Sequence, residues 1–85
     1  MNPVHLETLL AIVDEGSFDV AAAVLGISPS AVSQRIKALE SSTGRVLLRR
    51  AAPVTATEAG EILVQSARRM ALVQAETCLL YTSDA

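Results

Sequence analysis

The chain has 85 residues, of which 51% are hydrophobic, and a formal net charge of −2. This length allows at most one small domain, and the 14 alanines among its hydrophobic residues favour closely packed helices over a β-sandwich. One cysteine and one histidine exclude an internal disulfide and a zinc site. The longest apolar run, 20–25, is too short to span a membrane. The first basic residue, Arg35, comes too late for a secretory signal, so we expect a cytoplasmic protein.

Charge is distributed unevenly along the chain. Residues 1–27 carry four acidic residues and no basic ones, a net of −4. Residues 28–69 hold all seven basic residues against three acidic ones, a net of +4. A positive patch on an acidic small domain is typical of proteins that bind duplex DNA, because counterion release from phosphates provides much of the affinity. The charge distribution taken alone is explained equally well by solvated Arg and Lys side chains that only keep a helical domain in solution.

Two helices are predicted before the first basic residue. The first begins at Pro3, after the cap Asn2, and ends at Gly16, because Pro is favoured at the first helical position and Gly just past the last. Its helical period predicts one buried stripe, made of Leu6, Leu9, Leu10 and Val13. The second helix is short, between the cap Ser17 and Gly26, as hydroxyl caps and terminal glycines indicate. Its packing surface is Phe18, Ala21, Ala22 and Leu25.

A third helix begins with Ser28 as cap and Pro29 at its first position, and 41–44 ends it. Only 26–28 separate it from the short second helix, which matches a helix-turn-helix. The helical period divides this helix into two sides. The inward side is Val32, Ile36 and Leu39, and the outward side is Ser30, Gln34, Lys37 and Ser41, with Ser33 at its flank.

The outward side has the chemistry needed to read a DNA duplex. The Gln34 amide can pair with adenine, while Ser30 and Ser33 can bond to bases or to the backbone, and Lys37 suits a phosphate. Ser28 stands beside the free N–H groups of the helix N-terminus, which favour an anion. A polar helix face alone is more often a solvated surface, so the DNA-binding prediction depends on its combination with the tight turn and the charge distribution.

After Gly44, two β-prone runs at 46–48 and 54–55 predict a hairpin, which would be the wing of a winged helix-turn-helix. Arg49 and Arg50 would lie on this wing, near a DNA backbone or a minor groove. Arg35 stands at the edge of the buried stripe, where a structural ion pair and a DNA contact are both open. The predicted fold is therefore mainly α: three helices and a short hairpin, followed by a long helix.

The long helix is predicted over 57–76, with Thr57 as its cap. Gly60 costs such a helix about 1 kcal/mol relative to Ala, so either another backbone lies close to it or it occurs there by chance. The apolar face of the helix consists of Ile62, Leu63, Ser66, Ala67, Met70 and Val73. The final segment, 77–85, breaks this pattern, and we expect a non-native or disordered tail there.

The residues that carry a family resemblance run from Gly16-Ser17-Phe18 to the first turn of the predicted long helix. They are Ala21-Ala22, Leu25, the run 27–40, Gly44, Leu47-Leu48, Arg50 and 57–60. With this spacing, the chain resembles the N-terminal domain of LysR-type transcriptional regulators, and the match fades near Glu76. Ser30 stands where most of the family has Pro, which is similar to the arginine- and lysine-responsive branch of ArgP and LysG type that controls amino-acid export.

The resemblance implies a winged helix-turn-helix domain (1–56) and a linker helix (57–76) that forms dimers, with tetramers in full-length members. It places the base-reading residues on Pro29, Ser30, Ser33 and Gln34, and the wing arginine on Arg50. It implies dimerisation through Ile62, Leu63, Ala67, Met70 and Val73. RNA polymerase is a further partner that the family implies.

Two departures from the family limit what the resemblance implies. The wing is shorter, with Ala52-Pro53 where the family has a second basic residue, which weakens the case for insertion into a minor groove. The effector-binding domain that would follow Glu76 is missing from this sequence, so we expect no small-molecule ligand and no cofactor.

Two functions remain open from the sequence. The first is sequence-specific binding of double-stranded DNA in transcription regulation, and the second is a helical module that pairs with full-length regulators through 57–76 without binding DNA. An enzyme is not expected, because the sequence offers no nucleophile–base pair and no metal-ligand set. The scarcity of aromatic residues argues against single-strand binding by base stacking.

Overall fold

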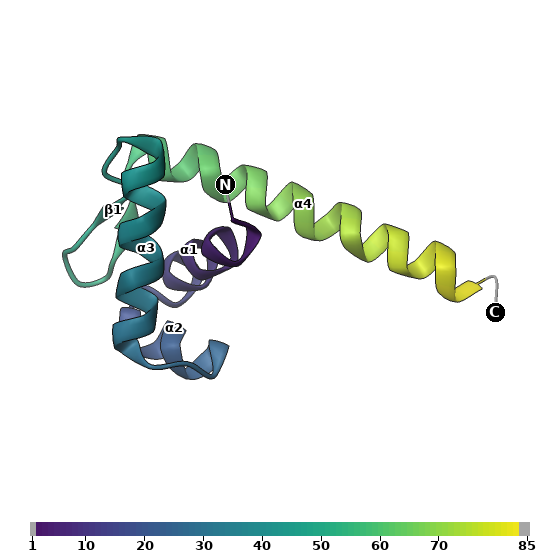
Figure 1. The fold of residues 1–85 in the computed structure, drawn as a ribbon, viewed down its shortest axis with the longest axis horizontal. Helices are drawn as coiled ribbons and strands as arrows, with labels where there is room; N and C mark the ends of the chain where they lie inside the picture. The colour runs from purple at the N-terminus through teal and green to yellow at the C-terminus, as the bar shows by residue number, and fades with distance from the viewer. Residues whose placement is uncertain (1, 84–85) are drawn as a thin grey trace.

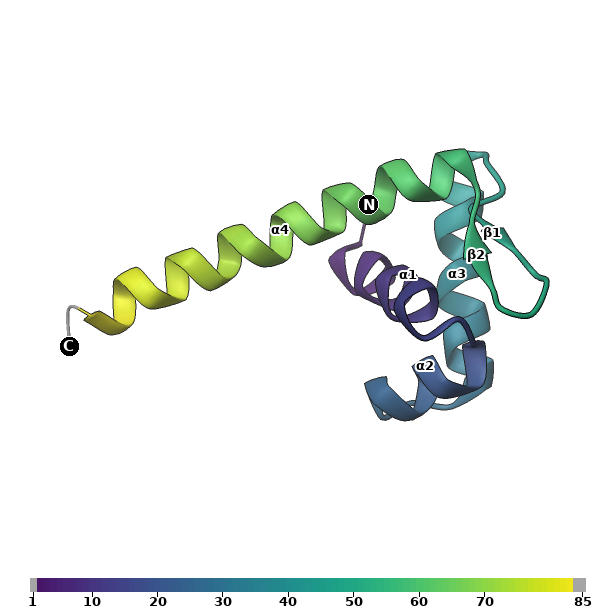
Figure 2. The same ribbon diagram turned by 180° about the vertical axis from the view of Figure 1, so that it is seen from behind.

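The computed structural model describes the backbone of residues 2–83 and the side chains of residues 2–73. The chain order is α1 (Pro3–Glu15), α2 (Phe18–Leu25), α3 (Pro29–Thr43), β1 (Leu48–Arg49), β2 (Thr55–Ala56) and α4 (Glu58–Ser83). The first three helices and the hairpin form one body, and α4 extends away from it (Figures 1 and 2). This is the mainly helical, winged arrangement that the sequence predicts.

The helices begin and end at the capping residues that the sequence indicates. The side chains of Asn2, Ser17 and Ser28 each accept a hydrogen bond from a backbone N–H in the first turn of α1, α2 and α3, respectively. Each of these helices ends at a glycine in the left-handed conformation, which costs little without a Cβ atom. The turn between α2 and α3 is consequently short, which fixes the two helices as a helix-turn-helix.

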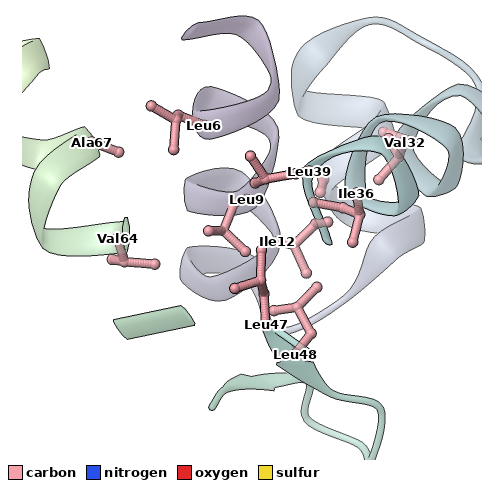
Figure 3. Packing of buried hydrophobic residues seen from close by; sticks show 12 residues of the cluster. Leu6, Leu9, Ile12, Val32, Ile36, Leu39, Leu47, Leu48, Val64 and Ala67 are labelled. Carbon is pink, nitrogen blue, oxygen red and sulfur yellow. The ribbon is translucent and has the colours of Figure 1, made fainter. Parts of the chain in front are cut away.

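Helix α1 lies at the centre of the core and contacts α2, α3 and α4. Figure 3 shows its apolar side chains facing those of α3, β1 and α4. The predicted stripe on α1 is partly wrong: Leu6 and Leu9 are buried, but Leu10 and Val13 are only half-buried. Ile12 and Thr8 are fully buried instead, because neighbouring elements cover α1 on more than one side. The rest of the core is Ala21, Ala22, Val32, Ile36, Leu39, Leu47, Leu48, Val64 and Ala67.

The wing is a two-stranded antiparallel hairpin in which Leu48 pairs with Ala56, and Arg49 with Thr55. β1 is shorter than the predicted run 46–48 and begins two residues later, while β2 has the predicted length and begins one residue later. The reason is that the backbone of Leu47 bonds elsewhere: its N–H donates to Glu40 and its carbonyl accepts from the Thr57 N–H. A hydrogen bond from the Val54 N–H to the Gly16 carbonyl (2.9 Å) fastens the returning side of the wing to the turn between α1 and α2.

Helix α4 begins against the segment that precedes the wing. The Thr57 hydroxyl accepts a hydrogen bond from the Gly60 N–H (3.1 Å) and donates one to the Val46 carbonyl (2.7 Å). A Cβ atom on Gly60 would lie only 2.0 Å from the Leu47 carbonyl oxygen. Close approach of a second backbone, one of the two explanations open from the sequence, is therefore the reason for a glycine at this position.

The helix runs to Ser83, beyond the predicted end at 76. The predicted tail, 77–85, lies outside the residues whose side chains are described. None of the described helices is both long enough and apolar enough to cross a membrane.

Candidate nucleic-acid interface

The side of α3 that turns away from the core is polar and exposed. Ser30, Ser33, Gln34 and Lys37 are all exposed, while Val32, Ile36 and Leu39 on the opposite side are at most 1% exposed. In Figure 1, α3 lies nearer to the viewer than α1, and Figure 2 shows it from behind. The structure thus places the predicted base-contacting side chains on one accessible face.

The N-terminus of α3 belongs to the same surface. Ser28 and Pro29 are exposed, and the Ser28 hydroxyl oxygen accepts a hydrogen bond from the Ala31 N–H at 3.1 Å. The hydroxyl proton of Ser28 remains a donor for a phosphate oxygen while the lone pair caps the helix. Free N–H groups in the first turn of a helix attract anions in the same way.

Arg35 turns toward α1. It is half-buried, and its Nη1 donates to the Thr8 hydroxyl at 3.4 Å. That hydroxyl is fully buried and donates in turn to the Val4 carbonyl at 2.8 Å. Of the two roles open from the sequence, this geometry favours the structural one, although the contact is a hydrogen bond between α3 and α1 and not an ion pair.

The two wing arginines differ in their surroundings. Arg49 is exposed in β1. The Arg50 guanidinium carbon lies 4.6 Å from the centroid of the Phe18 ring, a cation–π geometry. Its Nη2 atom lies 3.7 Å from Oε1 of Glu40, and 54% of its side chain is exposed. The wing therefore holds Arg50 against α2 and α3 and leaves part of its guanidinium open to solvent.

Glu40 is a site residue that the sequence did not reveal. Its Oε2 atom accepts a hydrogen bond from the Leu47 N–H at 2.8 Å, and its Oε1 atom faces Arg50. No spacing rule indicates this pairing, because the partners lie on a helix and on a loop that only the tertiary fold brings together. The one signal in the sequence was that Glu40 is acidic, whereas every other charged residue from α3 to the wing is basic.

The basic residues separate into two groups by their position. Lys37, Arg45 and Arg49 are exposed on α3 and on the segment that leads into and forms the wing. Arg68 belongs to α4, where its Nη2 atom lies 2.6 Å from Oδ1 of Asp14. The exposed basic residues beside the outward side of α3 are therefore fewer than the seven that the sequence count gives.

The predicted dimerisation residues do not share one surface. Ile62, Met70 and Val73 are exposed. Ala67, by contrast, is buried in the core of this chain, and Leu63 is half-buried against it. The reason is that α4 turns this side toward α1, a contact that the sequence pattern did not separate from a partner-facing stripe. Val64, outside the predicted set, is buried there as well.

Among the residues that the structure describes, no group of three or more His, Cys, Asp and Glu side chains could hold a metal ion. The described residues form α3 with its exposed polar side, the short helix α2 before it and a hairpin after it. A helix-turn-helix with a wing is the arrangement of many DNA-binding domains.

The chain belongs to the LysR family of bacterial regulators. The family model described as "Bacterial regulatory helix-turn-helix protein, lysR family" matches residues 3–61. The chain is 71% identical over 77 residues to the lysine export transcriptional regulatory protein LysG of Corynebacterium efficiens, covering 91% of this chain and 27% of that protein. It is 51% identical over 72 residues to the HTH-type transcriptional regulator LysG of Mycobacterium tuberculosis, covering 85% of this chain and 24% of that one. The chain thus spans about a quarter of the length of these relatives.

Solved structures show the same fold. Full-length LysG from Corynebacterium glutamicum with bound effector Arg superimposes with a TM-score of 0.96 at 61% identity, over 99% of this chain and 29% of that one. The BenM DNA-binding domain in complex with benA site 1 DNA superimposes with a TM-score of 0.91 at 31% identity, over the whole of both chains. The described fold is therefore that of the DNA-binding domain of LysR-type regulators.

Proposed function

We propose that this chain binds double-stranded DNA sequence-specifically, as the DNA-binding part of a LysR-type transcriptional regulator. The observation that carries the proposal is the exposed polar face of α3, whose opposite side is locked in the core by Val32, Ile36 and Leu39. The DNA complex formed by the structurally similar BenM domain supports it. The relatives are transcriptional regulators, which supports a function without catalysis.

The roles of individual residues follow from their chemistry. Ser30, Ser33 and Gln34, with Pro29 in van der Waals contact, would meet base edges in the major groove. Lys37, the Ser28 hydroxyl and the wing arginines would contact phosphates, which fix the register without reading sequence. Arg49 and Arg50 are the wing candidates, and Arg35 would support α3 from behind through Thr8.

The regulated process is proposed from the relatives. The names of the Corynebacterium relatives refer to lysine export, and one solved LysG structure holds arginine as its effector. We place this chain in the control of lysine or arginine export or metabolism. A protein that binds the bacterial chromosome would act in the cytoplasm.

Assembly is proposed from the exposed apolar residues of α4. Ile62, Met70 and Leu72 remain exposed after α4 has packed on α1, and burying them in a homodimer would remove apolar surface from water. A two-fold dimer would place two α3 helices on one partly palindromic site. RNA polymerase is a further proposed partner, through the regulator as a whole.

The experiment selects preferred duplexes from a random DNA library with the purified chain and then measures their affinity by fluorescence anisotropy at two salt concentrations. We expect a preferred sequence, and affinity that falls steeply with salt because phosphate contacts release counterions. The alternative is the pairing module that does not bind DNA. No enrichment of any duplex, together with heterodimer formation with a full-length LysG-type regulator, would establish that alternative.

A further inference from the structure

Leu47, in the segment between α3 and the wing, contacts α3, the start of α4 and the hydrophobic core. The N–H of this residue donates to Glu40 of α3 at 2.8 Å, and its carbonyl accepts from the Thr57 N–H at the start of α4 at 3.0 Å. Its side chain is fully buried in the core. Leu47 is thus one of the points that position the strand leading into the wing, together with the Thr57 bond to the Val46 carbonyl, and on the α3 side a carboxylate holds it.

The two oxygens of the same carboxylate have different partners. Oε2 accepts the Leu47 N–H, while Oε1 lies 3.7 Å from Nη2 of Arg50, the residue that follows β1. Phe18 lies under the face of the Arg50 guanidinium. The Arg50 guanidinium therefore has a carboxylate oxygen and an aromatic ring as neighbours within the protein. The guanidinium has five N–H donors in all, and its side chain is 54% exposed, so it can still meet a phosphate.

We propose that Glu40 is a positioning residue for DNA binding: it fixes the wing against α3 and aims Arg50 at the duplex, so that the recognition helix and the wing engage DNA as one unit. The proposal rests on the function proposed above and adds a residue that does not itself touch DNA. A carboxylate at a DNA-binding surface repels phosphates, so its presence there requires a compensating role. Holding the flexible Arg50 in place before binding supplies that role, because less side-chain freedom is then lost when the phosphate contact forms.

The test is a double-mutant cycle on the duplex selected by the wild-type chain. Arg50→Ala should weaken binding about tenfold, as expected for loss of a charged hydrogen bond. Glu40→Ala should weaken binding by a similar factor, and the double variant should bind no more weakly than Arg50→Ala alone. Glu40→Gln keeps an acceptor for the Leu47 N–H but loses the charge beside Arg50, so its affinity should lie between wild type and Glu40→Ala.

Two further measurements separate positioning from a general effect on folding or charge. Hydrogen exchange of the Leu47 amide should accelerate in Glu40→Ala and stay slow in Glu40→Gln. As a matched control, Gln34→Ala removes an exposed side chain on the outward side of α3, six positions before Glu40. In a variant that carries both Gln34→Ala and Glu40→Ala, the two losses of binding free energy should therefore add.

The outcomes are distinguishable. Both Glu40 variants could instead bind DNA more tightly than wild type, with Arg50→Ala weakening their binding by the same factor as in wild type. Glu40 would then be only a repulsive charge, and the inference would be wrong. If the Leu47 amide exchanges at the wild-type rate in Glu40→Ala, the carboxylate does not hold the wing. If the wild-type chain selects no duplex at all, the proposed function itself fails, whatever the Glu40 variants do.

Discussion

At the scale of single residues, Gln34 has the side chain that can best discriminate between bases. It is exposed on the outward side of α3, and its amide carries both a donor and an acceptor. We predict that Gln34→Ala weakens binding to the preferred site by about 1–3 kcal/mol and relaxes selection at one base position only. Repeating the library selection with the variant checks this. Equal weakening on every sequence would instead make Gln34 a backbone contact.

Lys37 is exposed one turn further along the same side and presents a point charge suited to phosphate. We predict that Lys37→Ala weakens binding to specific and random duplexes alike and lowers the salt slope by about one unit per half-site. Anisotropy titrations over a salt series measure the slope. Lys37→Arg keeps the charge and serves as the control, with an unchanged slope. A slope for Lys37→Ala equal to that of wild type would contradict a phosphate role.

The helical period was enough to predict which residues of α3 face outward, because a helix covered on one side exposes the other. The same rule failed on α1, where Ile12 and Thr8 are buried outside the predicted stripe. Contacts such as Glu40 with Leu47, or Arg35 with Thr8, could not be predicted. They depend on how helices and loops distant in sequence are placed, and residue type and spacing carry no information on that placement.

At the scale of elements, the start of α4 depends on one close backbone contact. Helix propensity alone would make Gly60→Ala stabilising by about 1 kcal/mol. The packing predicts the opposite sign, because the new Cβ atom would lie 2.0 Å from the Leu47 carbonyl oxygen, a backbone atom that cannot move without shifting β1. We predict a net loss of about 2 kcal/mol or more in the free energy of unfolding, measured by urea denaturation.

Ala71→Gly is the control for this prediction, since Ala71 is an exposed position of the same helix and should cost only the propensity difference of about 1 kcal/mol. A Gly60→Ala variant more stable than wild type would show that α4 can move away from Leu47 at no cost. The element boundaries themselves were largely predictable, because caps and terminal glycines act locally. The bounds of the wing strands were not, since the Leu47 backbone bonds to Glu40 and Thr57 and is thereby taken out of the strand that its β-propensity favours.

At the scale of the whole molecule, one apolar side of α4 packs in the core of this chain and another is exposed to solvent. Val64 and Ala67 are buried in the core of this chain, and the ion pair between Arg68 and Asp14 (2.6 Å) also joins α4 to α1. These contacts set the direction in which α4 leaves the domain (Figure 1). In a dimer formed through α4, that direction would set the separation of the two α3 helices, and with it the spacing of the half-sites.

A charged substitution on the exposed apolar side of α4 tests the proposed dimer most directly. Met70 is a poor probe, because it also lines a hollow with Pro3 and Leu6 of α1, and a charge there would disturb the fold of the monomer. Ile62 also lines a hollow, beside Leu47, but it is 63% exposed against 40% for Met70, so Ile62→Glu should leave the monomer folded. In a dimer that buries this side, the same substitution places an unpaired carboxylate in an apolar interface, which is strongly unfavourable.

We predict that Ile62→Glu sediments as a monomer in analytical ultracentrifugation at concentrations where the wild-type chain is dimeric. It should bind a palindromic site with an affinity reduced toward that of a single half-site, because the linkage between the two α3 helices is lost. Val24→Glu is the matched control: Val24 is 62% exposed on α2, so the same charge on a different element should leave the dimer intact. If Ile62→Glu remains dimeric, this side of α4 is not the interface, and the spacing of the half-sites must be set by another contact.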